Sequence, residues 1–275
     1  MSNAITLTAS VRQNLLSLQQ TAEAQSTTQN RLATGKKVNT ALDNPVNFFT
    51  AQGLTNRAGD LSNLLDSMTN AINTIGAANN GITSIIKLVQ SAQYLVSQAQ
   101  QTSDATTRSD LAAQFDAVRT QIDQLAADAG FNGINLLNGD NLTVTLNETN
   151  TSSVTVTGVT DTTAGALSIT SAVSAHNSWA ANSDITASAT ELTTALATLR
   201  SQSQSFGSSL STVQIRQDFT KSMINTLQTG ADALTLADSN EEGANMLALQ
   251  TRQQLSITAL SLASQANQAV LRLFA

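Results

Sequence analysis

The residues best suited to chemistry are few in this chain and lie far apart. His176 is the only histidine among 275 residues, and there is no cysteine. A lone histidine in a segment rich in Ala and Ser is more typical of a bystander than of a general base. The lack of thiols excludes disulfides and thiolate metal sites.

Carboxylates that are close in the sequence do not have catalytic spacing either. Glu241 and Glu242 are adjacent, so on a helix they point in different directions, and we expect them to begin a helix and complement its dipole. Asp123 and Asp128 have no His or Cys at metal-ligand spacing, and we expect them on a solvated face. No phosphate-binding glycine loop or nucleophile elbow is present in the sequence. We therefore expect no enzyme, no cofactor and no metal site.

Composition excludes further classes of protein. Charged residues make up 12% of the chain, aromatic residues 3%, and the net charge is −6. Such a chain lacks the clustered Lys and Arg that nucleic-acid phosphates require. No apolar run approaches the roughly 18 residues of a membrane span, so we expect no membrane partner. The N-terminus lacks the basic and apolar regions of a signal peptide, so any export is expected without a cleaved leader.

Both ends of the chain carry residues at coiled-coil spacing with almost no charge. A broad, weakly polar helix face is unfavourable in water, so we expect these ends to be buried by partners and to be disordered in an isolated monomer. The N-terminal seam comprises Thr8, Val11, Leu15, Leu18, Ala22, Gln25, Gln29 and Leu32. One C-terminal seam comprises Leu255, Ala259, Leu262, Ala266, Ala269 and Leu273, and its neighbour Ser256, Leu260, Ala263, Asn267, Val270 and Phe274.

The same spacing predicts three helices in the interior, over residues 54–96, 111–129 and 192–234. Alternating Leu and Val at 142–146 and 154–159, separated by a polar turn, predict a β-hairpin. Residues 160–188 have no clean period and are interpreted as an irregular surface insert. Polar seam residues are expected to pair across helices or to lie at the solvent margin; they are Asn79, Gln93, Gln217 and Asn267.

Turn residues mark the breaks between these elements. Gly35 fits the position after a helix end, and Asp43 precedes Asn44 and Pro45, which fit an N-cap and a first helical turn. Phe131, Asn132 and Gly133 are expected to close the helix that precedes them.

These elements predict a mainly α fold: an elongated antiparallel helical bundle with paired N- and C-terminal coiled-coil helices and a small β-hairpin insert. We expect a terminal coiled-coil domain (1–34 plus 244–275), linkers (35–44 plus 237–243), a helical bundle (45–140 plus 186–236) and an insert (141–185). The expected assembly residues are Val11, Leu15, Leu18, Leu32, Leu255, Leu260, Leu262, Val270, Leu273 and Phe274.

Three stretches of the chain resemble bacterial flagellins. Residues 30–45 (NRLATGKKVNTALDNP) are similar to the segment after the first flagellin helix, and residues 131–139 (FNGINLLNG) to the motif before the flagellin hairpin. Residues 239–274 resemble the C-terminal flagellin helix almost throughout. The resemblance covers roughly residues 1–140 and 190–275, in the family's order.

The resemblance implies a secreted structural subunit of the extracellular flagellar filament, which propels the cell. The terminal helices would line an inner tube, the long helices would form an outer tube, and the insert would face the medium. Implied partners are further copies of the chain, hook-associated and cap proteins, an export chaperone and the flagellar type III export apparatus.

Two alternatives remain at this point. A hook–filament junction protein has similar terminal helices but occupies a few positions without elongating. An enzyme housed in residues 135–188 is a more distant alternative, which the absence of a nucleophile–base pair disfavours.

Overall fold

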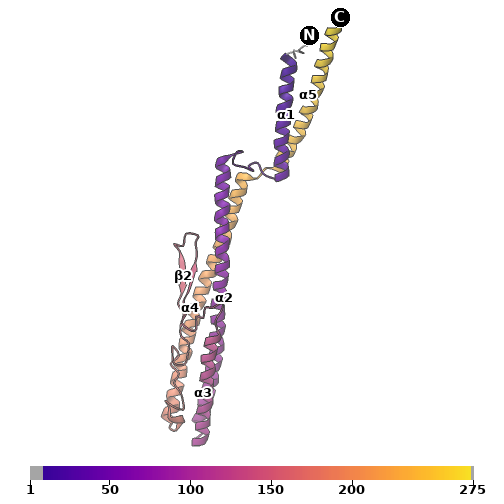
Figure 1. Ribbon diagram of the computed structural model, residues 1–275. Coiled ribbons are helices and arrows are strands. Elements are labelled where there is room, and N and C mark those ends of the chain that lie inside the picture. Colours follow the sequence, from indigo (N-terminus) through magenta and orange to yellow (C-terminus); the bar gives the residue numbers. More distant parts are fainter. Residues whose placement is uncertain (1–8, 274–275) are drawn as a thin grey trace. The chain divides into compact units, whose positions relative to one another are not determined.

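A computed structural model describes residues 9–273 of the chain, which divides into two compact units. Unit 1 comprises residues up to 56 and from 226 onward, and unit 2 comprises residues 57–225. Helices α2 and α4 contribute residues to both units. In chain order the elements of the described part are α1 (Ala9–Thr34), α2 (Pro45–Gln101), α3 (Ala105–Asp128), β1 (Leu142–Thr145), β2 (Ser153–Val156), the 3₁₀ turn η1 (Asn177–Trp179), α4 (Asn182–Thr235) and α5 (Ser239–Leu273) (Figure 1).

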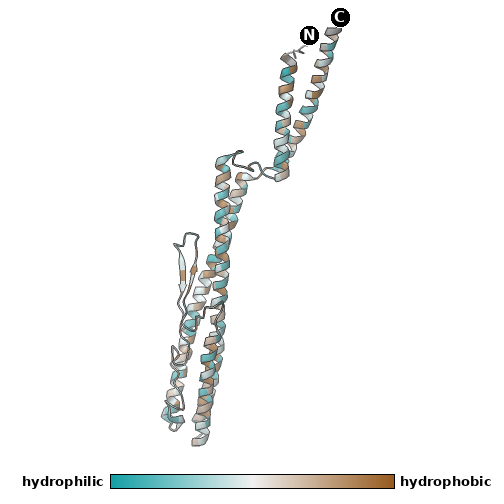
Figure 2. Ribbon diagram, viewed as in Figure 1, coloured by the Kyte–Doolittle hydropathy of each residue, from teal (hydrophilic) through white to brown (hydrophobic). Residues whose placement is uncertain are grey.

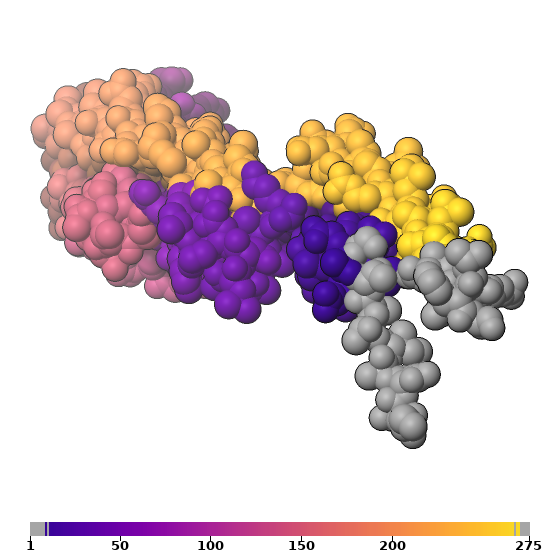
Figure 3. Space-filling view, turned by 90° about the horizontal axis from the view of Figure 1, so that it is seen from above, coloured from indigo at the N-terminus to yellow at the C-terminus, as the bar shows by residue number. Residues whose placement is uncertain are grey.

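The mainly α fold is confirmed, because each interior helix predicted from apolar spacing coincides with an observed helix to within one residue at its ends or lies inside it. In unit 1, α1 and α5 run side by side in opposite directions (Figures 1 and 3). No described helix is both long enough and apolar enough to cross a membrane. The predicted division of the chain into a terminal coiled-coil domain, linkers, a helical bundle and an insert remains a prediction.

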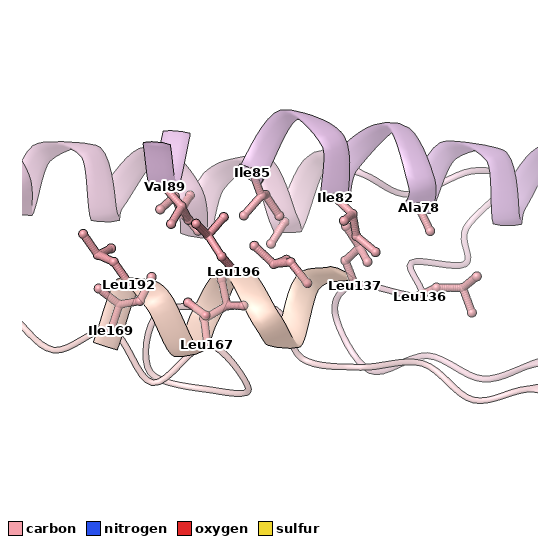
Figure 4. Close-up of a cluster of buried hydrophobic side chains, with 14 of the residues drawn as sticks. Ala78, Ile82, Ile85, Val89, Leu136, Leu137, Leu167, Ile169, Leu192 and Leu196 are labelled. Atoms are coloured by element: carbon pink, nitrogen blue, oxygen red, sulfur yellow. The ribbon is translucent and has the colours of Figure 1, made fainter. Parts of the chain in front are cut away.

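Unit 2 has a continuous hydrophobic core along α2, α3 and α4. Ile85 and Val89 point from α2 toward Leu192 and Leu196 of α4, and Ile82 points toward Leu137 (Figure 4). These positions repeat every three or four residues, so one face of each helix is removed from water. Across α2 and α4, Gln217 Nε2 donates to Thr69 Oγ1 at 2.9 Å, which is one of the polar pairs expected from the seams.

The segment after the hairpin is irregular, but the prediction that it is a surface insert is wrong. Leu167, Ile169, Ala172 and Trp179 are all wholly or nearly wholly buried in the unit 2 core. The hydrophobic period of a helix or strand is absent because these side chains reach the core from turns, from coil and from the short 3₁₀ turn η1.

A left-handed turn brings Trp179 into this core. Asn177, Ser178 and Trp179 have φ of 46°, 54° and 61°, a conformation that costs roughly 1–2 kcal/mol per residue. The Trp179 ring packs edge-to-face on the Phe115 ring, with 5.2 Å between the ring centroids. Its Nε1 donates to Ser188 Oγ at 2.9 Å. Burial of the large indole offsets the cost of the turn.

Charged side chains of α3 hold the insert in place. Asp116 accepts from Ser171 Oγ at 2.6 Å and from the Ala172 N–H at 2.9 Å. One turn on, Arg119 Nε donates to the Ile169 carbonyl at 2.9 Å, and Asp123 accepts from Thr163 N at 2.6 Å. The prediction that Asp123 lies on a solvated face is therefore wrong, whereas Asp128 is exposed as expected. Only the tertiary fold brings the Thr163 N–H and hydroxyl to the Asp123 carboxylate.

The hairpin forms where it was predicted, with Leu142 opposite Val156 and Val144 opposite Val154. Its loop is closed by Asn147, which donates to Thr149 and Thr151 Oγ1 and accepts from Ser152 N. Ahead of it, Asn135 Nδ2 donates to the Ala126 and Ala127 carbonyls near the end of α3.

Close packing explains one of the glycines inside α2. A Cβ atom at Gly81 would lie 2.7 Å from Leu137 Cδ1 and 2.8 Å from Ala129 Cβ, whereas nothing lies within 4 Å of one at Gly76. We predict that Gly81→Ala destabilises unit 2 by about 1–3 kcal/mol through overpacking. The matched variant Gly76→Ala should stabilise it by up to about 1 kcal/mol through helix propensity. Urea unfolding of both variants checks this, and equal shifts in the same direction would contradict it.

Candidate functional site: the terminal helix pair

Helix α1 turns a narrow and partly polar stripe toward α5. Val11, Thr21 and Thr28 are buried, and Leu18 is half-buried between them. The Thr21 hydroxyl donates to the Ser17 carbonyl at 2.8 Å, so its burial leaves no unpaired donor. The stripe therefore depends on hydroxyl residues as much as on apolar ones.

This stripe differs in part from the seam drawn from the sequence. Val11 and Leu18 lie in it, whereas Leu15 and Leu32 are exposed at its edge. The predicted seam passed over Thr21 and Thr28 because it stepped by four residues from Leu18 to Ala22 and from Gln25 to Gln29. A spacing of three and four residues from Val11 through Leu18 also reaches both threonines, and this signal was available.

Helix α5 has two apolar sides, and only one of them faces α1. Ser256, Leu260 and Ala263 form the half-buried side. No residue from 243 to 269 whose side chain the structure describes is fully buried. The contact with α1 thus removes little of this helix from water.

The opposite side of α5 is exposed and rich in leucine. Leu247, Leu255 and Leu262 have exposed fractions of 68%, 65% and 61%. At about 100° per residue these three positions fall within a sector of about 80°. We call this set the outer face of α5. Hydrophobic residues occur along the whole helix (Figure 2).

A partly buried ion pair joins the base of the two helices. Arg31 Nη1 lies 3.0 Å from Glu242 Oε1, and Glu242 is nearly wholly buried. Glu241 and Glu242 lie in the first turn of α5, as predicted, and Asp238 Oδ1 accepts from Asn240 N at 2.8 Å. Removal of Arg31 would leave a buried carboxylate without its partner, which is costly.

The two linkers pair with each other through their backbones. Gly35 has a φ of +68°, in the left-handed region that favours glycine, and its carbonyl accepts from Ala237 N at 3.0 Å. Lys37 N donates to the Thr235 carbonyl at 2.8 Å. A polar pocket of about 440 Å³ lies here within unit 1; it is lined by Arg31, Lys37, Val38, Asp43, Asn44, Asn47, Leu236, Ala237, Asp238, Glu241 and Glu242.

Asp43 closes the first linker. Its carboxylate accepts from Thr40 N and Asn39 N at 2.9 Å each, and these backbone hydrogen bonds lower the pKa of Asp43. Asn44 Oδ1 accepts from Asn47 N at 3.0 Å, which caps α2, and Pro45 occupies its first position.

A second apolar patch in unit 1 was missed by the sequence reasoning. Leu42, in the turn before α2, and Val46 and Phe49, at the start of α2, have exposed fractions of 96%, 73% and 64%. Their spacing of three and four residues was the available signal, but the predicted helix pattern began only at Leu54. Large exposed apolar side chains grouped in this way are typical of an interaction surface.

The candidates for catalysis have structural contacts. His176 Nε2 lies 2.7 Å from Thr170 Oγ1 and 3.1 Å from Glu191 Oε1, which ties the insert to α4. His176 thus has a structural contact, and its interpretation as a bystander and not a general base remains a prediction. The same nitrogen faces both partners, whereas a catalytic triad needs the base to lie between nucleophile and acid. Within residues 9–273, no group of three His, Cys, Asp or Glu side chains is placed to bind a metal.

The motif at Phe131 forms a tight turn. Phe131 and Ile134 exchange backbone hydrogen bonds of 2.9 and 3.0 Å, and Asn132 and Gly133 both have positive φ. Two positive φ values are those of a two-residue type I′ turn, for which Asn-Gly is favoured. Among the expected assembly residues, Phe274 lies outside the described part, as do the side chains of Val270 and Leu273.

Comparison with known proteins assigns a family to this arrangement. The chain matches the bacterial flagellin N-terminal helical region over residues 5–142 and the bacterial flagellin C-terminal helical region over residues 189–274. It is 32% identical to flagellin FljM of Caulobacter vibrioides over 90% of this chain and 89% of that one. It is 27% identical to a flagellin of Brucella melitensis over 100% of this chain and 98% of that one.

Among solved structures, the crystal structure of Bacillus cereus flagellin aligns with a TM-score of 0.47 and 20% identity, covering 55% of this chain and 86% of that one. The two family regions lie at the two ends of the chain, and each includes one of the terminal helices α1 and α5. The chain therefore belongs to the bacterial flagellin family, the structural subunits of the flagellar filament.

Proposed function

We propose that this flagellin joins neighbouring copies in the filament through the outer face of α5 and the exposed edge of α1. The observation that carries the proposal is that Leu247, Leu255 and Leu262 lie on the side of α5 away from α1. A helix with apolar residues on both sides needs a second partner. A second copy of the chain has the same exposed apolar residues on α1 and α5 and can therefore be that partner.

The energetics favour assembly over a lone chain. Burial of each exposed leucine contributes about 1–2 kcal/mol, and the outer face carries three of them. Leu15, Leu16 and Leu32 add further exposed area on α1. A contact between unlike surfaces of successive copies does not close on itself and so produces an open filament.

Further partners follow from membership of the family and are part of the proposal. We infer that the chain is secreted through the flagellar type III export apparatus with the help of an export chaperone, and that hook-associated and cap proteins contact the terminal helices. The exposed Leu42, Val46 and Phe49 patch supports a further contact between copies.

A hook–filament junction protein is not favoured, since both family regions are those of flagellin. Self-polymerisation separates the two functions. Purified chain that elongates into long filaments under electron microscopy supports the filament subunit, whereas assembly that stops at short rings would support the junction protein.

The outer face can be tested without altering the contact with α1. We predict that Leu255→Gln with Leu262→Gln raises the critical concentration for polymerisation at least tenfold, since about 2–4 kcal/mol of burial is lost per contact. Gln250→Ala with Gln268→Ala, at exposed polar positions of α5 about 60° outside the sector of the outer face, is the control and should polymerise normally. Sedimentation of filaments measures both. An unchanged critical concentration in the leucine variant would contradict the proposal.

Truncation tests whether unit 2 is independent of the terminal helices. Removal of the residues after Met246 should abolish filaments, because the outer-face residues Leu247, Leu255 and Leu262 are lost. Circular dichroism should still report a cooperative unfolding transition, since the unit 2 core contains no residue of α5. Normal filaments from the truncated chain would refute this mechanism.

Hydrogen exchange tests the expectation that the terminal helices are ordered only by neighbours. In the dilute monomer, amides of residues 246–266 should exchange much faster than those of α3, because the α1 contact buries little of α5. In filaments the same amides should be protected. Full protection of both terminal helices in the dilute monomer would rule the expectation out.

A further inference from the structure

An unpaired carboxyl group lies inside unit 2. The side chain of Asp161, in the insert, is wholly buried. Neither of its carboxyl oxygens has a hydrogen-bond partner of acceptable geometry, and the same is true of Gln202 Oε1 on α4. The Gln202 amide nevertheless lies close enough to contribute to the pKa of Asp161. Buried oxygens without donors are rare, since each costs free energy.

A count of donors and acceptors indicates what is missing. An ionised Asp161 offers only acceptors, and the Gln202 amide can donate to one of its oxygens, which leaves Oε1 and the other carboxyl oxygen unpaired. A neutral Asp161 can donate its O–H to Gln202 Oε1 while the Gln202 Nε2–H donates to the second carboxyl oxygen. One added proton thus satisfies all three unpaired atoms.

The charged groups of the surrounding elements are engaged elsewhere. On α3, Arg119 donates to Ile169 and Thr163, and Asp123 accepts from Thr163. In the loop before the hairpin, Asp140 accepts from Asn135 N, and on α4 Arg200 is exposed. No described ion pair includes Asp161, and desolvation is the largest cause acting on its pKa.

We propose that Asp161 and Gln202 form a proton-dependent contact between the insert and α4, made by the neutral carboxylic acid and lost on ionisation. Burial raises the pKa of Asp161 from 3.8 to about 6. The folded chain therefore binds more protons than the unfolded chain between about pH 4 and 6. The contribution of this group to stability is complete below pH 4 and is lost as the pH rises through 6.

The monomer at high dilution provides the test, with urea unfolding followed by circular dichroism between pH 4.5 and 7.5. The ratio of the unfolding constant of the wild type to that of Asp161→Asn should rise roughly tenfold or more over this range. Asn keeps the shape and an N–H donor but cannot ionise. Asp128→Asn, at an exposed position of α3, should leave the pH dependence of the wild type unchanged.

Carbon NMR of the Asp161 carboxyl in the wild-type chain gives a second measurement that does not depend on the variant folding. A titration midpoint near 6 supports the proposal, and a midpoint near 4 overturns it. A ratio of the two unfolding constants that stays the same across the pH range would also overturn it. So would stabilisation of the wild type at pH 7 by calcium ions that is absent in Asp161→Asn, since the unpaired oxygens would then bind a cation.

Discussion

The two-sided apolar surface of α5 is the constraint from which the behaviour of unit 1 follows. A single neighbouring helix covers only one side of α5, so it cannot bury leucines that lie on opposite sides of it. Within the chain, α1 covers one side with a stripe of Val, Leu and Thr, and the Arg31–Glu242 pair fixes the base of the contact. The other side is exposed. An almost uncharged sequence is consistent with this, because charges on the outer face would oppose its burial.

Unit 2 is held together by different chemistry. Its helices bury large aliphatic side chains along a common core, and its irregular insert is fixed by polar contacts from α3. Asp116, Arg119 and Asp123 bind backbone groups of the insert that no strand or helix satisfies. The buried Trp179 then anchors the end of the insert beside Phe115. A self-contained core of this kind is the basis for the expectation that unit 2 folds without a neighbouring copy.

The sequence predicted those features that repeat with a fixed period, because periodicity reports burial of one face. The long helices and the hairpin belong to this group. The turn residues around Pro45 were predictable for another reason, because Asn and Pro have local preferences for the start of a helix. Features that depend on distant segments could not be read in the same way. Asp123 binds Thr163 of the insert, His176 of the insert contacts Glu191 of α4, and Leu167 and Trp179 reach the core from turns. Thr21 and Thr28 were recoverable, since a step of three residues after Leu18 and after Gln25 reaches them.

The hairpin loop has a consequence for protein engineering. Side-chain contacts of Asn147 close the loop on itself, while Thr149, Asn150 and Thr151 at its tip are exposed. Exposed polar loop tips accept added residues at little cost to the elements on either side. A foreign epitope or affinity tag introduced there would leave the β1–β2 register intact, and in a polymer it would be displayed once per subunit.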